Sequence, residues 1–533
     1  MKPTARRGKA AADNVKATVA GIFLNFLFSF VSRRILVLCM GPDYVGLGSL
    51  VGNIAILLTL LDFGASSAVI YRLYRPLADG DETAVSQKLS YYPRLCRLSA
   101  VLTSAAGLLY LPFVPDAAVG FSDTEILYTA YLLRLIPMSA SYLFSPFRVL
   151  LFADQKNYTC QWISYIFGGL CVLSEGIGLL IFHSYMFSLF CHPVLSLTED
   201  FIVRRYAKKQ YPDVTFSGSQ TVPVSLRRSM RREILRLQPT GIAGTLLCTL
   251  DNFLVVRLFG VTGNGLYSNY NMLIGYAFMF SVTLIGALSA SVGNLGASEK
   301  PEKAYGIFRI TCLAAYFPIN IAAVILFVLS GDIMTVWLGK DALLPSWISL
   351  ALTAQFCIRA LRQSVLIFRD AYGLYRRERI KPFAELAFSL IFSWILGKKL
   401  GLGGVYVGQT LSAFLVCFWY EPYVLFRYGF HMRVFPYYRL VVRFLTVTGL
   451  SCYCGSILCA MIPSFSARFA VCFAVAVLFF FGGFYGTDVL SQLLRRLALT
   501  RFCTVRGAVA VRDAKRDKRA VSQKTVINQK KYV

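Results

Sequence analysis

Long apolar runs alternate with short polar segments along most of the chain. Each run holds about 20 residues, the length that an α-helix needs to cross roughly 30 Å of hydrocarbon. Run length and the helix-breaking residues between runs predict about fourteen membrane-spanning helices, or twelve or thirteen if a weak run is re-entrant. Their expected limits are 17–40, 47–71, 95–115, 125–147, 160–182, 185–203, 238–259, 266–290, 306–330, 345–368, 382–400, 402–426, 439–462 and 467–490.

The longest internal polar segment, 204–237, divides these spans into six before it and eight after it. We expect this segment to be a cytoplasmic loop between two lobes. The expected parts are an N-lobe over 1–203, a C-lobe over 238–430, two extra helices over 431–490 and a tail over 491–533. The tail is basic and almost without apolar periodicity, which predicts a disordered or membrane-surface cytoplasmic segment.

An internal repeat favours the two-lobe division. Residues 34–49 align with residues 253–268 at a constant offset of 219 positions. The paired positions include Gly41 with Gly260, Gly46 with Gly265, and Ser49 with Ser268. Each segment is a glycine-bearing turn that joins two spans on the outer side. This shared orientation predicts a parallel duplication, with two pseudo-symmetric six-helix lobes related by an axis along the membrane normal.

Composition places the chain in the membrane class. Its 533 residues have a mean hydropathy of +0.58 and only 15% charged residues, whereas soluble domains carry about 25%. The fold class is therefore an all-α polytopic membrane protein. The net charge of +28 favours contact with anionic lipid headgroups over nucleic-acid binding.

The basic residues set the orientation of the spans. Of the 55 Lys and Arg residues, 45 fall on alternate sides of the apolar runs and six fall inside them. The other side holds only Lys340, Lys398, Lys399 and Arg468. Because cytoplasmic loops carry the excess of Lys and Arg, this pattern places both termini in the cytoplasm.

Several functional classes find no support in the sequence. The 14 cysteines lie mostly inside spans and form no C-x-x-C motif, and only three histidines are present, so no disulfide scaffold or metal site is expected. No G-x-x-x-x-G-K-[ST] motif is present, and the outer loops are too short for the catalytic domain of a membrane glycosyltransferase or ligase. We therefore expect a non-enzyme without a cofactor, and the sequence leaves open whether H⁺ or Na⁺ drives it.

Arginines inside the spans are the first functional candidates, because burying a charge in the bilayer is expensive. Arg359 and Arg362 lie near the middle of one span and three residues apart, so they share a helical face, and Arg369 extends that stripe. We expect Arg359 and Arg362 to bind substrate. The alternative is a structural bridge to another helix.

The first span carries a polar stripe that includes Asn25 and Ser29 and ends in Arg33 and Arg34. Such a stripe is expected to face the interior of the bundle rather than lipid. The two arginines are roughly 100° apart on a helix, so only one is expected to face a cavity. The alternative is that one or both extend outward to the interface.

Two further arginines lie closer to the outer ends of their spans. Arg134, three residues before Pro137, suits a cavity or an outward extension equally well. Arg257 is expected to reach the outer surface.

A few polar residues inside spans are candidates for ion coupling or for lining the cavity. Asp251 and Asn252 occupy the repeat equivalents of Ser32 and Arg33, and an ion pair is the first expectation for Asp251. Glu175 is a buried acid to which the sequence assigns no partner. The acids Glu385 and Glu421 lie close enough to helix ends to be ordinary interface residues.

The excess of arginine over acid within the spans predicts a cationic cavity. Guanidinium groups bind phosphate oxygens through paired donors and keep their charge when partly desolvated. An anionic substrate fits this composition better than an organic cation does.

Two blocks of sequence carry a resemblance to a known family. MGPDYVGLGSLVGNIAILLTLLDFGASSAVIYRLYRPLADGD, beginning at Met40, resembles the opening hairpin of Wzx-type oligosaccharide flippases of the polysaccharide transporter family. KPFAELAFSLIFSWILGKKLGLGGVYVGQTLSAFLVCFWYEPYVLFRYGF, beginning at Lys381, resembles a second stretch typical of the same bacterial group. The family belongs to the multidrug/oligosaccharidyl-lipid/polysaccharide exporter (MOP) superfamily, whose two six-helix lobes enclose a central cavity.

The resemblance implies translocation of a polyprenyl-diphosphate-linked oligosaccharide to the outer leaflet of the bacterial inner membrane by alternating access. It places the protein in the biosynthesis of O-antigen (the lipopolysaccharide glycan), capsule or exopolysaccharide. The implied partners are the lipid-linked glycan, membrane lipids, a polysaccharide polymerase and glycosyltransferases. The two extra helices and the basic tail also suit peptidoglycan-precursor flippases of the same superfamily, and a drug-type exporter is a further alternative.

Overall fold

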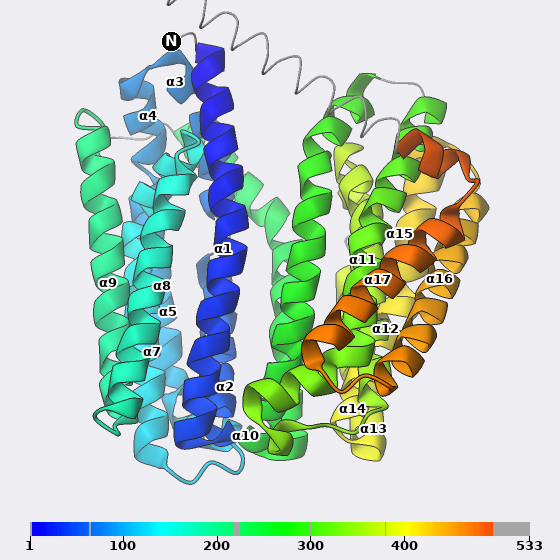
Figure 1. The fold of residues 1–533 in the computed structure, drawn as a ribbon. Coiled ribbons are helices and arrows are strands. Elements are labelled where there is room, and N and C mark those ends of the chain that lie inside the picture. The colour runs from blue at the N-terminus through cyan, green and yellow to red at the C-terminus, as the bar shows by residue number, and fades with distance from the viewer. Residues whose placement is uncertain (1–2, 63–64, 217–223, 299–300, 379, 494–533) are drawn as a thin grey trace, which may run out of the picture.

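The computed structural model describes residues 3–62, 65–216, 224–298, 301–378 and 380–493, and every regular element in these ranges is a helix. Figure 1 shows two bundles of helices side by side. The first bundle contains α1 (Pro3–Met40), α2 (Pro42–Leu58), α3 (Ala65–Asp79), α4 (Glu82–Leu89), α5 (Tyr92–Tyr110), α6 (Val114–Ala117), α7 (Thr124–Ala153), α8 (Asn157–Leu180) and α9 (Tyr185–Gln210). The second contains α10 (Val224–Ser298), α11 (Pro301–Leu338), α12 (Ile348–Ala371), α13 (Lys381–Leu400), α14 (Leu402–Ser412), α15 (Phe418–Leu425), α16 (Phe435–Ala460) and α17 (Phe465–Phe484).

The helix count agrees with an integral membrane protein of about fourteen spans. In the described ranges, eleven helices are long and apolar enough to cross a membrane. One of them, α10, makes two passes, because its 75 residues change direction at Gly260, which has φ 73°. The shorter apolar helix α2 and the 20-residue helix α13 lie in two further runs that hydropathy predicted to span the membrane. The prediction of an all-α polytopic membrane protein is confirmed.

Several helices extend beyond the limits expected from hydropathy. Helix α9 continues to Gln210 and α10 begins at Val224, so much of the expected 204–237 loop is helical. Basic residues such as those of this segment are good helix formers, and a span continues into the cytoplasm until a breaker ends it. Of the tail expected over 491–533, residues 494–533 lie outside the described part.

The second expected span, 47–71, differs most from the structure. Helix α2 already begins at Pro42, directly after Gly41 with φ 89°. Proline is favoured in the first turn of a helix because its missing N–H would be unpaired there in any case. A 3-10 turn at Thr59–Asp62 ends α2, and the amphipathic α3 continues to Asp79. The apolar run is therefore two helices rather than one.

The two C-terminal helices pack against α11 through polar as well as apolar contacts. The Asn320 side chain of α11 donates to the Ala476 carbonyl of α17 at 2.9 Å. The Thr448 hydroxyl of α16 donates to Asn320 Oδ1 at 2.8 Å. Hydrogen bonds of this kind join helices where lipid provides no hydrophobic driving force.

The two bundles meet at the outer side through the glycine turns of the repeat. We call residues 41–49 and 260–268 the outer interface. A β-carbon at Gly46 would lie 1.9 Å from the Val261 carbonyl oxygen, and one at Gly265 would lie 2.2 Å from the Pro42 carbonyl oxygen. These are equivalent contacts, since 42 and 261 are also related by the offset of 219. Only glycine permits this approach of the two backbones.

Polar contacts in the outer interface reinforce this closure. The Thr262 hydroxyl donates to the Asp43 carboxylate, and Asn264 Nδ2 donates to the Gly46 carbonyl at 3.0 Å. Figure 1 shows the bundles close together at this end and further apart at the end that carries the N terminus.

Candidate functional site

A polar cavity of about 360 Å³ lies inside the second bundle. Its wall includes residues from α10, α12, α13 and the α14 region, among them Asp251, Asn252, Tyr267, Asn271, Gln355, Arg359, Arg362, Glu385, Ser389 and Gln409. The cavity therefore collects charged, amide and hydroxyl groups from helices far apart in the sequence.

Arg359 reaches this cavity from α12, and the Asp251 carboxylate lines the same cavity. Helix α12 places Arg359 one turn before Arg362, as the spacing of three predicts. Its guanidinium lies over the Phe278 ring, 5.5 Å from the centroid. Arg359 is exposed, and no carboxylate in the described residues lies within 4.0 Å of it. An exposed guanidinium beside neutral amides can bind an anion through its paired N–H donors.

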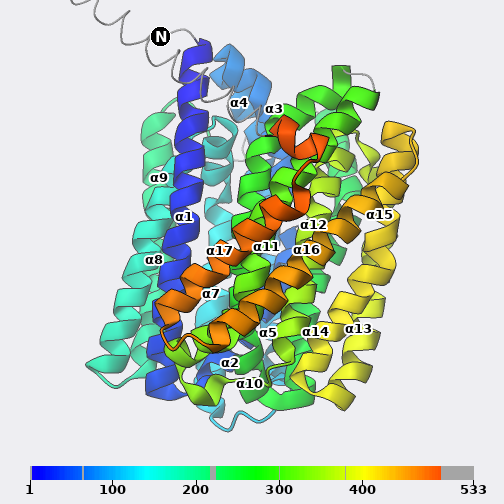
Figure 2. The ribbon, with the colours of Figure 1, turned by 45° about the vertical axis from the view of Figure 1, so that its right-hand side comes forward.

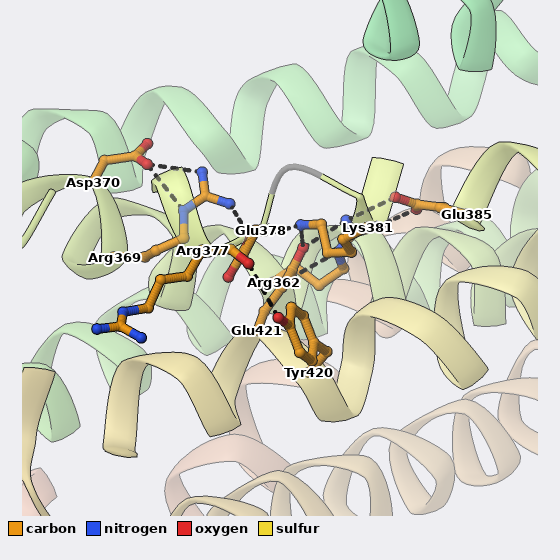
Figure 3. Close-up of polar contacts among 9 residues, drawn as sticks. All are labelled: Arg362, Arg369, Asp370, Arg377, Glu378, Lys381, Glu385, Tyr420 and Glu421. Atoms are coloured by element: carbon orange, nitrogen blue, oxygen red, sulfur yellow. Dashed lines mark hydrogen bonds and ion pairs between the residues drawn. The ribbon is translucent and has the colours of Figure 1, made fainter. Parts of the chain in front are cut away.

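Arg362 lines the same cavity but is held by two acids. Its Nε and Nη2 atoms donate to Glu421 at 3.0 and 2.8 Å, and Nη1 donates to Glu385 at 2.8 Å (Figure 3). Glu421 has a side-chain exposure of 0%. The paired geometry is that of a structural bridge, which was the alternative to substrate binding for this residue.

The same bridge continues toward the cytoplasmic end of the bundle. Lys381 donates to Glu421 and, at 3.0 Å, to Glu378. Arg369 donates to Glu378 at 2.7 Å (Figure 3). We call Arg362, Arg369, Glu378, Lys381, Glu385 and Glu421 the ion-pair network. It ties α12, α13 and α15 together.

The acids of this network are what sequence reasoning missed. Glu385 and Glu421 were expected to be ordinary interface residues, and the structure shows this to be wrong, because both are buried partners of Arg362. Because these two acids are buried beside Arg362, the interior of the C-lobe carries less net positive charge than expected. Glu385 and Glu421 lie 36 positions apart in two different helices, so no short sequence pattern indicates that both pair with Arg362.

Asp251 and Asn252 lie at the cavity wall on α10. The Ser389 hydroxyl lies 3.5 Å from Asp251 Oδ1, and Asp251 forms no ion pair with a described cation. Asn252 instead faces the first bundle, where its Oδ1 lies 3.4 Å from the Ser49 hydroxyl. The described residues contain no group of three or more His, Cys, Asp and Glu that would hold a metal ion.

The polar stripe of α1, expected to face the interior of the bundle, has partners in both bundles, since Ser32 donates to Glu175 of α8 and Ser29 lies beside Tyr276 of α10. Tyr276 of α10 donates to the Asn25 carbonyl at 2.8 Å, and its hydroxyl lies 2.9 Å from the Ser29 hydroxyl. The Asn25 contact uses the backbone, so its amide side chain is not the contacting group.

Arg33 and Arg34 both reach from α1 to the second bundle. Arg33 Nη1 donates to Ser268 Oγ and Asn269 Oδ1, each at 2.7 Å. Arg34 Nη1 donates to the Val336 carbonyl at 2.9 Å and to the Trp337 carbonyl in α11. Only one of the two was expected to face a cavity, whereas both donate to residues of the second bundle. Both arginines close the outer side, and neither touches the cavity around Arg359.

The contacts of Arg33 and Asn252 are equivalent under the repeat. Position 33 corresponds to position 252, and position 49 corresponds to position 268. Arg33 bonds to Ser268 just as Asn252 pairs with Ser49. The two-fold relation of the turns therefore extends into the spans that they join.

The remaining candidates lie elsewhere. Arg134 Nη1 lies 3.1 Å from His192 Nε2 on α9. Glu175 on α8 accepts a hydrogen bond from the Ser32 hydroxyl, which is the partner that the sequence did not identify. Arg257 is exposed on α10, three residues before the Gly260 turn on the outer side, where an outward extension was expected. The structure does not bring Arg134 together with Arg359.

The solved structures to which this fold is similar include a lipid flippase and multidrug transporters. No family model matches the sequence, and no curated protein matches it. A structure described as lipid II flippase MurJ in an inward closed conformation aligns with a TM-score of 0.63 at 14% identity, covering 92% of this chain and 99% of that one. An inward-facing multidrug resistance MATE transporter of the MOP superfamily aligns with a TM-score of 0.63 at 11% identity, over 78% of this chain and 98% of the other. An outward-facing MATE transporter of the same superfamily aligns with a TM-score of 0.57 at 13% identity, over 79% and 95%. The chain thus has the fold of MOP-superfamily transporters.

Proposed function

We propose that the protein is a flippase that carries a polyprenyl-diphosphate-linked oligosaccharide from the cytoplasmic to the outer leaflet by alternating access. Its place would be the bacterial inner membrane, in the biosynthesis of O-antigen, capsule or exopolysaccharide. The observation that carries the proposal is Arg359, an exposed guanidinium that lines a polar cavity of about 360 Å³ and lies within 4.0 Å of no carboxylate among the described residues. Such a group binds diphosphate oxygens through paired donors.

The surrounding cavity supplies neutral hydrogen-bonding groups for a polar headgroup. The Gln355 amide bonds to Gln409, and Gln409 in turn donates to the Tyr267 hydroxyl at 2.7 Å. This chain of amides and hydroxyls is anchored within the protein, so a ligand meets a preorganised surface. In this proposal Arg359 binds the diphosphate, and the amide-rich wall binds the polar groups next to the diphosphate.

Alternating access requires an outer side that closes and reopens. The outer interface provides the closing contact, and the hydrogen bonds of Arg33 and Arg34 extend it along α1. Arg33 is the second arginine that we assign to the substrate, which it would meet after release from Ser268 when the outer side opens. Either H⁺ or Na⁺ is a candidate coupling ion, with Asp251 as the residue to test.

The test is flipping of a fluorescent polyprenyl-diphosphate-linked oligosaccharide in proteoliposomes. Arg359→Ala is expected to reduce the initial rate by at least tenfold, because a hydrogen-bonded charge pair contributes about 1.5–3 kcal/mol. Arg257→Ala, which removes an exposed arginine on α10, is the matched control and should flip at the wild-type rate. An undiminished rate for folded Arg359→Ala protein would remove the proposed site.

A peptidoglycan-precursor flippase is the second candidate. It is favoured by the coverage of 92% of this chain by the MurJ structure, against 78% by the MATE structure, which agrees with the two additional helices here. The same assay separates the two proposals when lipid II replaces the oligosaccharide lipid. A drug-type exporter would flip neither lipid, and its transport of organic cations would depend on Asp251 rather than on Arg359.

A further inference from the structure

A second hollow lies on the outside of the second bundle, at its cytoplasmic end. It has a volume of about 910 Å³ and is lined mainly by apolar and aromatic side chains of α13, α15 and α16 and of the π-helical turn between α14 and α15. Leu415, Val416 and Ala384 form its apolar part, and Trp419, Tyr420 and Tyr438 supply its aromatic part. We call this hollow the lateral groove.

The orientation of the helices places the lateral groove in the cytoplasmic leaflet. Lys381 begins α13 and Arg427 follows α15, and both belong to the basic segments that face the cytoplasm. Trp and Tyr are enriched at this depth, where an amphipathic ring meets the headgroups. The groove therefore combines an apolar floor with an interfacial aromatic wall.

Arg377 provides a positive charge at the rim of the groove. Its guanidinium stacks on the Tyr428 ring at 3.8 Å, and its backbone carbonyl accepts a hydrogen bond from Tyr420 at 3.1 Å. No carboxylate of the described residues lies within ion-pair distance of Arg377, whereas Lys381, at the inner edge of the groove, is paired with both Glu378 and Glu421. Figure 3 shows Arg377 turned away from the ion-pair network.

The geometry points to an anionic phospholipid of the cytoplasmic leaflet as the occupant of the lateral groove. One acyl chain would lie along Leu415, Val416 and Ala384, and the headgroup phosphate would bind Arg377. The apolar floor can contact a hydrocarbon chain, and the Arg377 guanidinium, which has no carboxylate partner among the described residues, can bind the phosphate above it.

The position of the groove distinguishes this lipid from the transported one. Figures 1 and 2 place α13, α15 and α16 on the side of the second bundle away from α1. Between the groove and the Arg359 cavity stands the ion-pair network, in which Glu421 binds Lys381 on the groove side and Arg362 on the cavity side. The groove is thus a separate site, and its lipid does not depend on the proposed flippase function.

The experiment uses the full chain in nanodiscs that contain a trace of phospholipid with a photoreactive group in its acyl chain. Peptides that contain residues 415–423 are quantified after irradiation, once with a phosphatidylglycerol probe and once with a phosphatidylcholine probe. One arginine near the membrane surface contributes about 1 kcal/mol, so the anionic probe should label this segment about fivefold more strongly. Arg377→Gln should bring the ratio to about one, and Arg377→Lys should restore most of it.

Arg205→Gln is the matched control, because Arg205 is an exposed arginine at the cytoplasmic end of α9 in the other bundle. Its labelling ratio should equal that of the wild type. Equal labelling by the two probes, or an unchanged ratio in Arg377→Gln, would overturn the proposal. Displacement of the phospholipid probe by an equal amount of polyprenyl phosphate would also overturn it, by assigning the groove to the substrate's tail. None of these outcomes changes the expected effect of Arg359→Ala on flipping.

Discussion

The close backbone contact between the two bundles makes Gly46 an informative position to change. A β-carbon there would lie 1.9 Å from the Val261 carbonyl oxygen, and separations under 3.0 Å essentially never occur. Gly46→Ala therefore requires the turns of the outer interface to separate by about 1 Å. Gly265→Ala imposes the same demand from the other bundle, where the β-carbon would lie 2.2 Å from the Pro42 carbonyl oxygen.

Overpacking of this kind costs about 1–3 kcal/mol when the surroundings cannot adjust. Because both contacted atoms belong to the backbone, adjustment means moving the bundles apart. The substitution destabilises only the conformation in which the outer side is closed. A difference of about 1–3 kcal/mol shifts the ratio of closed to open protein by about 5- to 150-fold.

Distance measurements by electron paramagnetic resonance test this shift. Spin labels at Asp116 and Lys340, both exposed on the outer side, should show an increased population of long distances in Gly46→Ala. Labelling through an unnatural amino acid avoids the 14 native cysteines. The control is Gly48→Ala, because a β-carbon there meets nothing within 4 Å and the gain in helix propensity is the same. Identical distance distributions for Gly46→Ala and Gly48→Ala would refute the reasoning.

Two further substitutions probe the charges. Glu421→Gln removes a buried carboxylate that pairs with both Arg362 and Lys381, which should destabilise the fold by about 3–5 kcal/mol. The thermal unfolding midpoint in detergent should fall. The control is Asp370→Asn, which changes an exposed partner of Arg369 and should leave the midpoint unchanged. Arg33→Gln removes the charge from two hydrogen bonds between the bundles, which should destabilise the closed outer side by about 1.5–3 kcal/mol. The population of long distances should therefore rise as in Gly46→Ala. A distance distribution like that of the wild type would show that Arg33 does not hold the outer side closed.

Features with a strong local period were predictable from the sequence. Spans of about 20 apolar residues and the alternation of Lys and Arg were enough to identify the membrane fold, because bilayer thickness and positive loops act on each segment separately. The spacing of three also placed Arg359 and Arg362 on one face. The end of α2 near Leu58 was not predictable, because the apolar run continues through the break.

The partners of the arginines were the part that sequence reasoning could not reach. Glu385 and Glu421 are 23 and 59 residues from Arg362, so their pairing depends on how α12, α13 and α15 pack. Arg359 and Arg362 carry the same charge on the same face, yet of the two only Arg362 meets acids among the described residues. Tertiary packing therefore decides which of two neighbouring arginines forms direct ion pairs.

The repeated contacts at the outer interface have the form of a symmetric dimer. In a two-fold assembly, residue i of one subunit meets residue j of the other, and j meets i in return. The Ser49–Asn252 and Ser268–Arg33 pairs obey this rule after the offset of 219 is removed, and so do Gly46 with Val261 and Gly265 with Pro42. The joined halves thus preserve the interface that two copies of one six-helix subunit would form. The repeat-equivalent positions 33 and 252 hold Arg and Asn, so this pair of positions places a positive charge on only one side of the interface.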